Sequence, residues 1–149
     1  MMYNACMKIH RTHTMAPAHM YSCASRVISF LTKRDDLEIT CEVMRMRKTQ
    51  YRWSAKRIID STDFMYDTEI RFLLRHLLRK TRLMIPQRTI TVQQVSKKLK
   101  TGECALVMIN LHILLVKDSC VYDVNHFGTK VEHCMWRNAK VKWYQRCKL

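Results

Sequence analysis

Cysteine and histidine are the residues whose types and positions could carry covalent chemistry in this chain. A cysteine thiolate can attack a carbonyl carbon when a nearby imidazolium favours the thiolate and a third group orients the imidazole ring. Cys23 lies just inside a predicted helix start, where the helix dipole favours an anion. It also lies on the apolar face of that helix, where a cysteine commonly packs in the core. Cys23 therefore has two interpretations, a nucleophile or a core side chain.

The other cysteines are widely spaced, and no two form a Cys-x-x-Cys pair. The total of seven is odd, so we predict reduced thiols rather than a disulfide framework. A structural zinc site usually has two close pairs of ligands. His and Cys residues gather near both ends of the chain, at Cys6, His10, His13 and His19 and at Cys120, His126, His133 and Cys134. Neither group contains two such pairs, so we expect no metal and no cofactor.

The charge balance suggests a second kind of chemistry, the binding of an acidic partner. The chain has 27 Lys and Arg against 12 Asp and Glu, a net charge of +15. Cations contact phosphates and aromatic rings stack on bases, so two surfaces could hold nucleic acid. They are an arginine stripe on one predicted helix, Arg71, Arg75, Arg79 and Arg82, and a basic tail containing Trp136 and Trp143. The alternatives are a solvated helix face and tryptophans that anchor the tail.

Helices should dominate the first half of the chain. With only 2 Gly and 2 Pro, it lacks the many tight turns of a strand-rich sandwich or barrel. Apolar spacing predicts a helix from Ser22 to about Arg34. The acidic pair at residues 35–36 opens a second helix. The expected inner stripe of the second helix is Leu37, Cys41 and Met44.

Two further helices are predicted before the middle of the chain. Ser54 can cap a short helix in which Ile58 and Ile59 point inward. Asp67 or Thr68 can cap the next helix. Its apolar stripe is the longest in the chain and consists of Ile70, Leu73, Leu74, Leu77 and Leu78.

The uncharged run from Ala105 to Asn110 predicts a central strand. It follows a helix that Thr91 can cap and a glycine, Gly102, that suits the left-handed position after a helix end. The run shows no alternation of apolar and polar residues, which is typical of a strand buried on both faces. Residues 113–116 are either its hairpin partner or its continuation. The predicted fold class is α+β, with a helical N-terminal half followed by a small, mainly antiparallel sheet.

We expect one domain over residues 21–149, after a poorly structured leader at residues 1–20. Residues 117–149 have scattered apolar positions, so their elements are the least defined by the sequence. No apolar run is long enough to cross a bilayer, and the N-terminus lacks the apolar core of a signal peptide. These features favour a cytoplasmic or nuclear protein.

Four segments in this order resemble the guanylyl cyclase domain-containing family, whose members are similar to papain-like thiol hydrolases of the bacteriocin-processing peptidase type. They are MYSCASRVISFL, TQYRWSAKRI, DFMYDTEIRFLLRHLL and RTITVQQVSKKLKTGECALVMINLHIL. The last is the most specific, because it resembles the family's Thr-Ile-Ser/Thr-Val, helix, Gly, Ala-Ile-Val-Leu-Val-Asn element. The resemblance covers about Tyr21 to Leu115 and implies a papain-like fold.

The resemblance also implies a cysteine nucleophile, in two possible registers. The family's first helix begins with Trp-Asp-Cys-Gly. If Cys23 matches this cysteine, Ser22 replaces the Asp and Ala24 replaces the Gly. If Cys23 instead matches a cysteine one turn later, the nucleophile position falls near His19 and no thiol occupies it.

The base and the orienting group are implied in the same way. His126, in Asn125-His126-Phe127, is the nearest match to the family's histidine, and Asn138 is placed to orient it. The chain thus resembles a thiol hydrolase or acyl transferase with a disturbed active site. The alternative is a non-catalytic basic module that binds nucleic acid. Nucleotide cyclisation has no support in these residues, because there is no Gly-rich phosphate loop.

Overall fold

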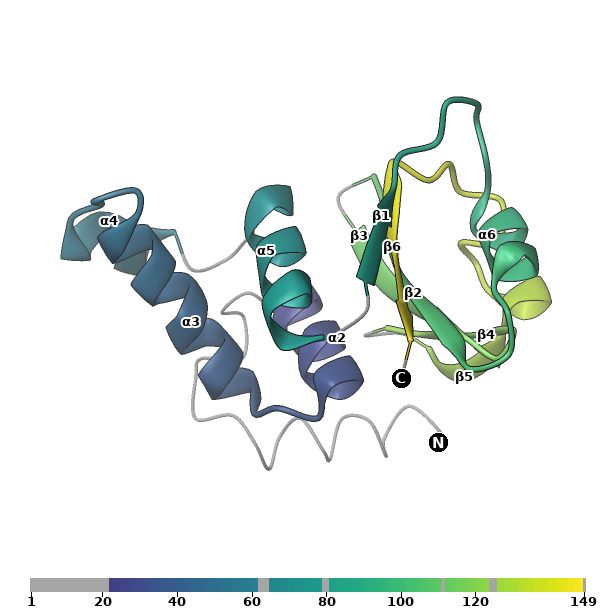
Figure 1. Cartoon of the computed structure of the whole chain (residues 1–149), viewed down its shortest axis with the longest axis horizontal. Coiled ribbons are helices and arrows are strands. Elements are labelled where there is room, and N and C mark those ends of the chain that lie inside the picture. Colours follow the sequence, from purple (N-terminus) through teal and green to yellow (C-terminus); the bar gives the residue numbers. More distant parts are fainter. Residues whose placement is uncertain (1–21, 62–64, 79–80, 111, 124–125, 149) are drawn as a thin grey trace.

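The computed structural model describes residues 22–61, 65–78, 81–110, 112–123 and 126–148, without the side chains of Ser22, Cys23, Arg26 and Asp36. A six-stranded sheet has helices on both sides (Figure 1). On one side are α2 (Ser22–Thr32), α3 (Asp36–Thr49), α4 (Ala55–Asp60) and α5 (Asp67–Leu77), and on the other are α6 (Val92–Lys98) and the 3₁₀ turn η1 (Val131–His133). The predicted leader at residues 1–20 lies outside the described part.

Every strand pairing in the sheet is antiparallel. The strands are β1 (Thr81–Met84), β2 (Glu103–Ile109), β3 (His112–Lys117), β4 (Cys120–Tyr122), β5 (Phe127–Lys130) and β6 (Trp143–Lys148). Their order across the sheet is β1-β6-β2-β3-β4-β5, so β1 and β5 form its edges. The prediction of an α+β fold, with helices first and an antiparallel sheet after them, is confirmed.

The burial of β2 on both faces explains why residues 105–109 carry no charge. Leu106 and Met108 belong to the core under α2 and α5, whereas Ala105, Val107 and Ile109 belong to the core under α6. All seven residues of the strand are buried. β2 therefore needs apolar side chains on both faces, which removes the alternation that a half-solvated strand shows.

The segment after β2 is its hairpin partner, not its continuation. β3 pairs with β2 in antiparallel register, with Leu106 opposite Leu115. The last strand of the chain, β6, lies on the other side of β2, with Val107 opposite Tyr144. The tail therefore completes the centre of the sheet, which the scattered apolar pattern of residues 117–149 did not predict.

Local capping bonds begin three of the helices as predicted. Asp35 accepts a bond from the amide of Leu37, and Ser54 accepts one from the amide of Arg57. Thr91 and Gln94 form a reciprocal capping box at the start of α6. Each cap satisfies amides that have no partner within the helix, so a few residues suffice to define the start.

The predicted inner face of α3 is wrong. Leu37 and Cys41 are exposed, and Met44 is half-buried. Ile39, Val43 and Met46 face the core instead. The prediction for α4 is wrong for one of its two isoleucines, since Ile58 is buried and Ile59 is exposed.

A buried ion pair ties α3 to α5. The Arg47 guanidinium donates to both carboxylate oxygens of Glu69, at 2.9 and 3.0 Å, and both side chains are fully buried. Glu69 also accepts the backbone amide of Tyr66 at 2.8 Å. Tyr66 is therefore the N-cap of α5, and the prediction of Asp67 or Thr68 as its cap is wrong. No helix in the described ranges is long and apolar enough to cross a membrane.

Candidate functional site

A buried carboxylate, Asp123, holds two histidines beyond the end of β4. Its Oδ2 lies 2.8 Å from Nε2 of His112, and its Oδ1 lies 2.9 Å from Nδ1 of His126. The same Oδ1 accepts the backbone amide of His126 at 2.7 Å. The Asp123 side chain is completely buried, whereas 12% of the His112 side chain and 11% of the His126 side chain are exposed. The carboxylate is thus shielded while both rings reach solvent.

The contact with Asp123 orients the His126 ring. A carboxylate at Nδ1 favours the tautomer that carries its proton on that nitrogen, so Nε2 is left as the basic nitrogen. The Asp123 amide also donates to the His126 carbonyl at 2.8 Å, which fixes the loop from both ends. His126 is therefore held in one orientation through its ring and its backbone.

The orienting residue differs from the one that the resemblance implied. Asn138 is exposed in the turn at residues 135–138, and Asp123 binds the His126 ring in its place. Sequence reasoning missed Asp123 and His112. The Asp-x-x-His spacing after a strand was an available signal for Asp123, since an Asp side chain commonly bonds an amide a few residues on. No local pattern pointed to His112, because it lies in β3 and Asp123 follows the neighbouring strand β4.

Helix α2 contacts β4 and the first residue of β5 through Phe30. The Phe30 ring stacks on Tyr122, with centroids 5.1 Å apart, and meets the edge of Phe127 at 5.6 Å. Phe127 directly follows His126. This aromatic cluster, Phe30, Tyr122 and Phe127, fixes one face of α2 beside the histidine.

Cys23 lies in the first turn of α2, seven residues before Phe30. Seven residues are close to two helical turns, so both residues belong to the same helix face, about 10 Å apart along the axis. The Cys23 side chain lies outside the described part of the chain.

Trp136 packs against His112, one of the two histidines that bind Asp123. The His112 ring packs against Trp136, with centroids 5.2 Å apart, and Trp136 is half-buried. Its indole nitrogen is buried and has no hydrogen-bond partner among the described residues. Trp136 therefore serves as a wall of this cluster, and its contact with His112 limits how a base could stack on it.

The predicted arginine stripe does not lie on one helix face. Helix α5 ends at Leu77, Arg82 lies exposed in β1, and Arg79 falls outside the described residues. Arg75 is exposed on α5. Arg71 is half-buried and lies 5.6 Å from the ring of Trp143.

Trp143 belongs to the core rather than to a surface. It is 5% exposed, and its indole NH donates to Asp67 at 2.8 Å. A base could stack on this ring only if the core opened. The alternative interpretation of Trp143, anchoring of the tail to the domain, matches this placement.

The described cysteines outside α2 are free thiols: Cys41, Cys104, Cys120, Cys134 and Cys147. Cys104 and Cys147 face each other on β2 and β6, and their contact, together with burial, raises the pKa of the Cys147 thiol strongly. Burial likewise raises the pKa of Cys134. No described residues form a cluster of three or more potential metal ligands.

Comparisons with known proteins give no match: no protein-family model, no curated protein and no solved structure is similar to this chain.

Proposed function

We propose that this chain is a thiol hydrolase or acyl transferase with a papain-like arrangement, a divergent relative of the guanylyl cyclase domain-containing family. In this proposal Cys23 is the nucleophile, His126 is the base and Asp123 orients the base. The observation that carries it is the 2.9 Å contact between the buried Asp123 carboxylate and Nδ1 of His126. A buried carboxylate on that nitrogen is how triads of this class hold their histidine.

The chemistry follows from these roles. Nε2 of His126 takes the proton of the Cys23 thiol, and the thiolate attacks the carbonyl carbon of an acyl substrate. The imidazolium then returns the proton to the leaving group, and a thioester remains on Cys23. Water or an acceptor amine attacks this thioester and gives a proton to Nε2. The bond between the acyl carbon and the Cys23 sulfur breaks, and the imidazolium returns the proton to the departing thiolate. The reaction requires Cys23 and His126 to lie within hydrogen-bond reach.

The placement of α2 supports the pairing of these two residues. Helix α2, which holds Cys23 in its first turn, contacts Phe127, the residue after His126, through Phe30. Cys23 shares the helix face of Phe30, and the N-terminal turn of a helix favours a thiolate.

The test is the alkylation of individual cysteines by iodoacetamide, followed by mass spectrometry of the full chain. We expect Cys23 to react faster than Cys41, which is exposed on α3 and serves as an internal reference. His126→Ala should slow the reaction of Cys23 about tenfold and leave Cys41 unchanged. Equal rates at the two cysteines, or a Cys23 rate insensitive to His126→Ala, would refute the proposal.

A second candidate is a non-catalytic module that binds nucleic acid through charge. The exposure of Arg75 and Arg82 and the net charge of +15 favour it. Cys23→Ala distinguishes the two functions, because it removes thiol chemistry and leaves salt-sensitive binding of single-stranded DNA intact. Absence of DNA binding at low salt would eliminate the second candidate.

A further inference from the structure

A cationic surface lies at the end of the helical layer farthest from α6 (Figure 1). We call it the α3–α4 tip. Its exposed cations are Arg45, Lys48, Arg52, Lys56 and Arg57. Two acidic residues accompany them: Glu42, which pairs with Arg45, and Asp60. The tip therefore carries a strong positive charge of its own.

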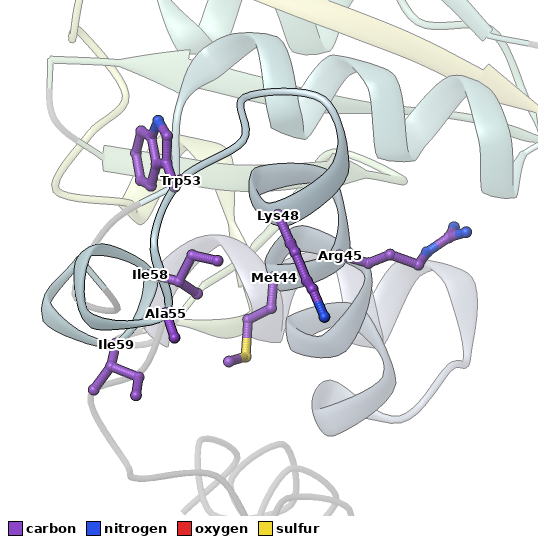
Figure 2. Close-up of a pocket in the computed structure, with 7 residues that line it drawn as sticks. All are labelled: Met44, Arg45, Lys48, Trp53, Ala55, Ile58 and Ile59. Carbon is purple, nitrogen blue, oxygen red and sulfur yellow. The ribbon is translucent and has the colours of Figure 1, made fainter.

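An apolar pocket opens between these cations. It has a volume of about 380 Å³ and is lined by Met44, Trp53, Ala55, Ile58 and Ile59, with Arg45 and Lys48 at its rim. Figure 2 shows Met44 of α3 facing Ala55 and Ile58 of α4, while the Arg45 side chain points away. Beside the pocket, Ile59 is 62% exposed and Tyr51 is 37% exposed. An apolar pocket, an exposed isoleucine and five exposed cations thus belong to α3, α4 and the segment between them.

The chemistry of this surface fits lipid better than nucleic acid. The Trp53 ring already packs against Arg57 at 3.9 Å and against Arg47 at 5.1 Å. Tyr51 and Tyr66 also contact this ring. A base would have to displace these neighbours to stack on Trp53. The apolar pocket lining also offers few hydrogen-bonding groups to a base edge, whereas it suits hydrocarbon.

We propose that the α3–α4 tip docks this protein on the surface of an anionic phospholipid bilayer. Lys48, Arg52 and Lys56 contact lipid phosphates and carboxylates, while Ile59 and Tyr51 enter the headgroup region. The pocket between α3 and α4 receives the apolar part of one lipid. This inference is independent of the thiol chemistry, since it uses none of the residues around Asp123.

The first test measures sedimentation of the full chain with lipid vesicles. We expect binding to vesicles of equimolar phosphatidylcholine and phosphatidylserine, and little binding to phosphatidylcholine alone. The double variant Lys48→Glu, Lys56→Glu should lower the partition coefficient about 25-fold or more, because each basic residue near an anionic surface contributes about fivefold. The matched control, Lys97→Glu with Lys98→Glu, reverses two exposed charges on α6. Equal losses in both double variants would overturn the proposal.

Two isoleucine variants test the apolar contribution to vesicle binding. Ile59 and Ile85 are similarly exposed, at 62% and 65%, and only Ile59 belongs to the α3–α4 tip. Ile59→Ser should weaken vesicle binding several-fold, whereas Ile85→Ser should not. Equal effects of the two serine variants, or a failure of the wild-type chain to bind phosphatidylserine vesicles, would overturn the proposal. Single-stranded DNA could also displace the chain from vesicles. If it does, and Ile59→Ser leaves vesicle binding unchanged, the tip binds nucleic acid instead.

Discussion

Two buried carboxylates, Glu69 and Asp123, differ in the side chains that bind them. Glu69 is bound by Arg47, which is always charged, and both side chains are fully buried. Asp123 is bound by His112 and His126, whose rings are partly exposed. The first arrangement is sealed from solvent, so its contribution is to the stability of the fold. The second leaves two histidine rings within reach of solvent.

The largest loss of stability is expected on substitution of Arg47. Arg47→Met should lower the free energy of unfolding by about 3–5 kcal/mol, because it leaves the Glu69 carboxylate buried without its cation. Urea unfolding measures this loss. The matched control is Arg45→Met, which removes an exposed pair with Glu42 and should cost at most about 1 kcal/mol. Similar costs for both variants would show that the Glu69 carboxylate is not held as described.

Asp123→Asn tests the other half of the comparison. It should cost about 1–3 kcal/mol of stability, since bonds to two rings and one amide are weakened. It should also lower the alkylation rate of Cys23, if His126 acts as its base. Asp118→Asn, at an exposed turn with a positive φ of 51°, is the control and should change neither property. A stable Asp123→Asn variant with full thiol reactivity would remove Asp123 from the site.

A third buried carboxylate, Glu103, should make the stability of the fold depend on pH. Bonds from the Arg146 guanidinium and the Lys100 amide lower the pKa of Glu103 below its ordinary value. The pKa of Glu103 is thus lower in the folded state than in the unfolded state. The ion pair of Glu103 with Arg146 therefore stabilises the fold fully when the pH is above the unfolded-state pKa. This stabilisation is lost as the pH falls through the folded-state pKa. Glu103→Gln should flatten the loss of stability that urea titrations measure as the pH falls below the ordinary pKa of Glu. An unchanged slope would contradict the pairing.

The smallest effect is expected at a helix cap. Ser54→Ala removes the bond to the amide of Arg57 and should cost about 0.5–1 kcal/mol. Because α4 is remote from Asp123, the reactivity of Cys23 should not change. Thermal melting and alkylation of the same sample measure both quantities, and a change in thiol reactivity would link the two regions.

Sequence reasoning succeeded where the cause of a structure is local. Ser54, Thr91 and Asp35 cap helices through amides within three residues, and Gly102 takes a positive φ of 82° after α6. The candidate site was predicted only in part, because His126 was identified and its orienting carboxylate was not. Trp143, for which a binding surface and anchoring of the tail were both open, lies in the core, where Asp67, 76 residues earlier, accepts its indole NH.

The sequence by itself determined the helical N-terminal half, the complete burial of β2 and the excess of positive charge. These follow from short-range hydrogen bonds, from an uninterrupted apolar run and from composition. Only the tertiary structure decided which face of α3 is buried, since two overlapping apolar stripes are available on that helix. It also decided that Arg47 finds Glu69 and that His112 finds Asp123, because these partners are 22 and 11 residues apart in the chain. Contacts at such separations depend on how the elements pack, which no local pattern encodes.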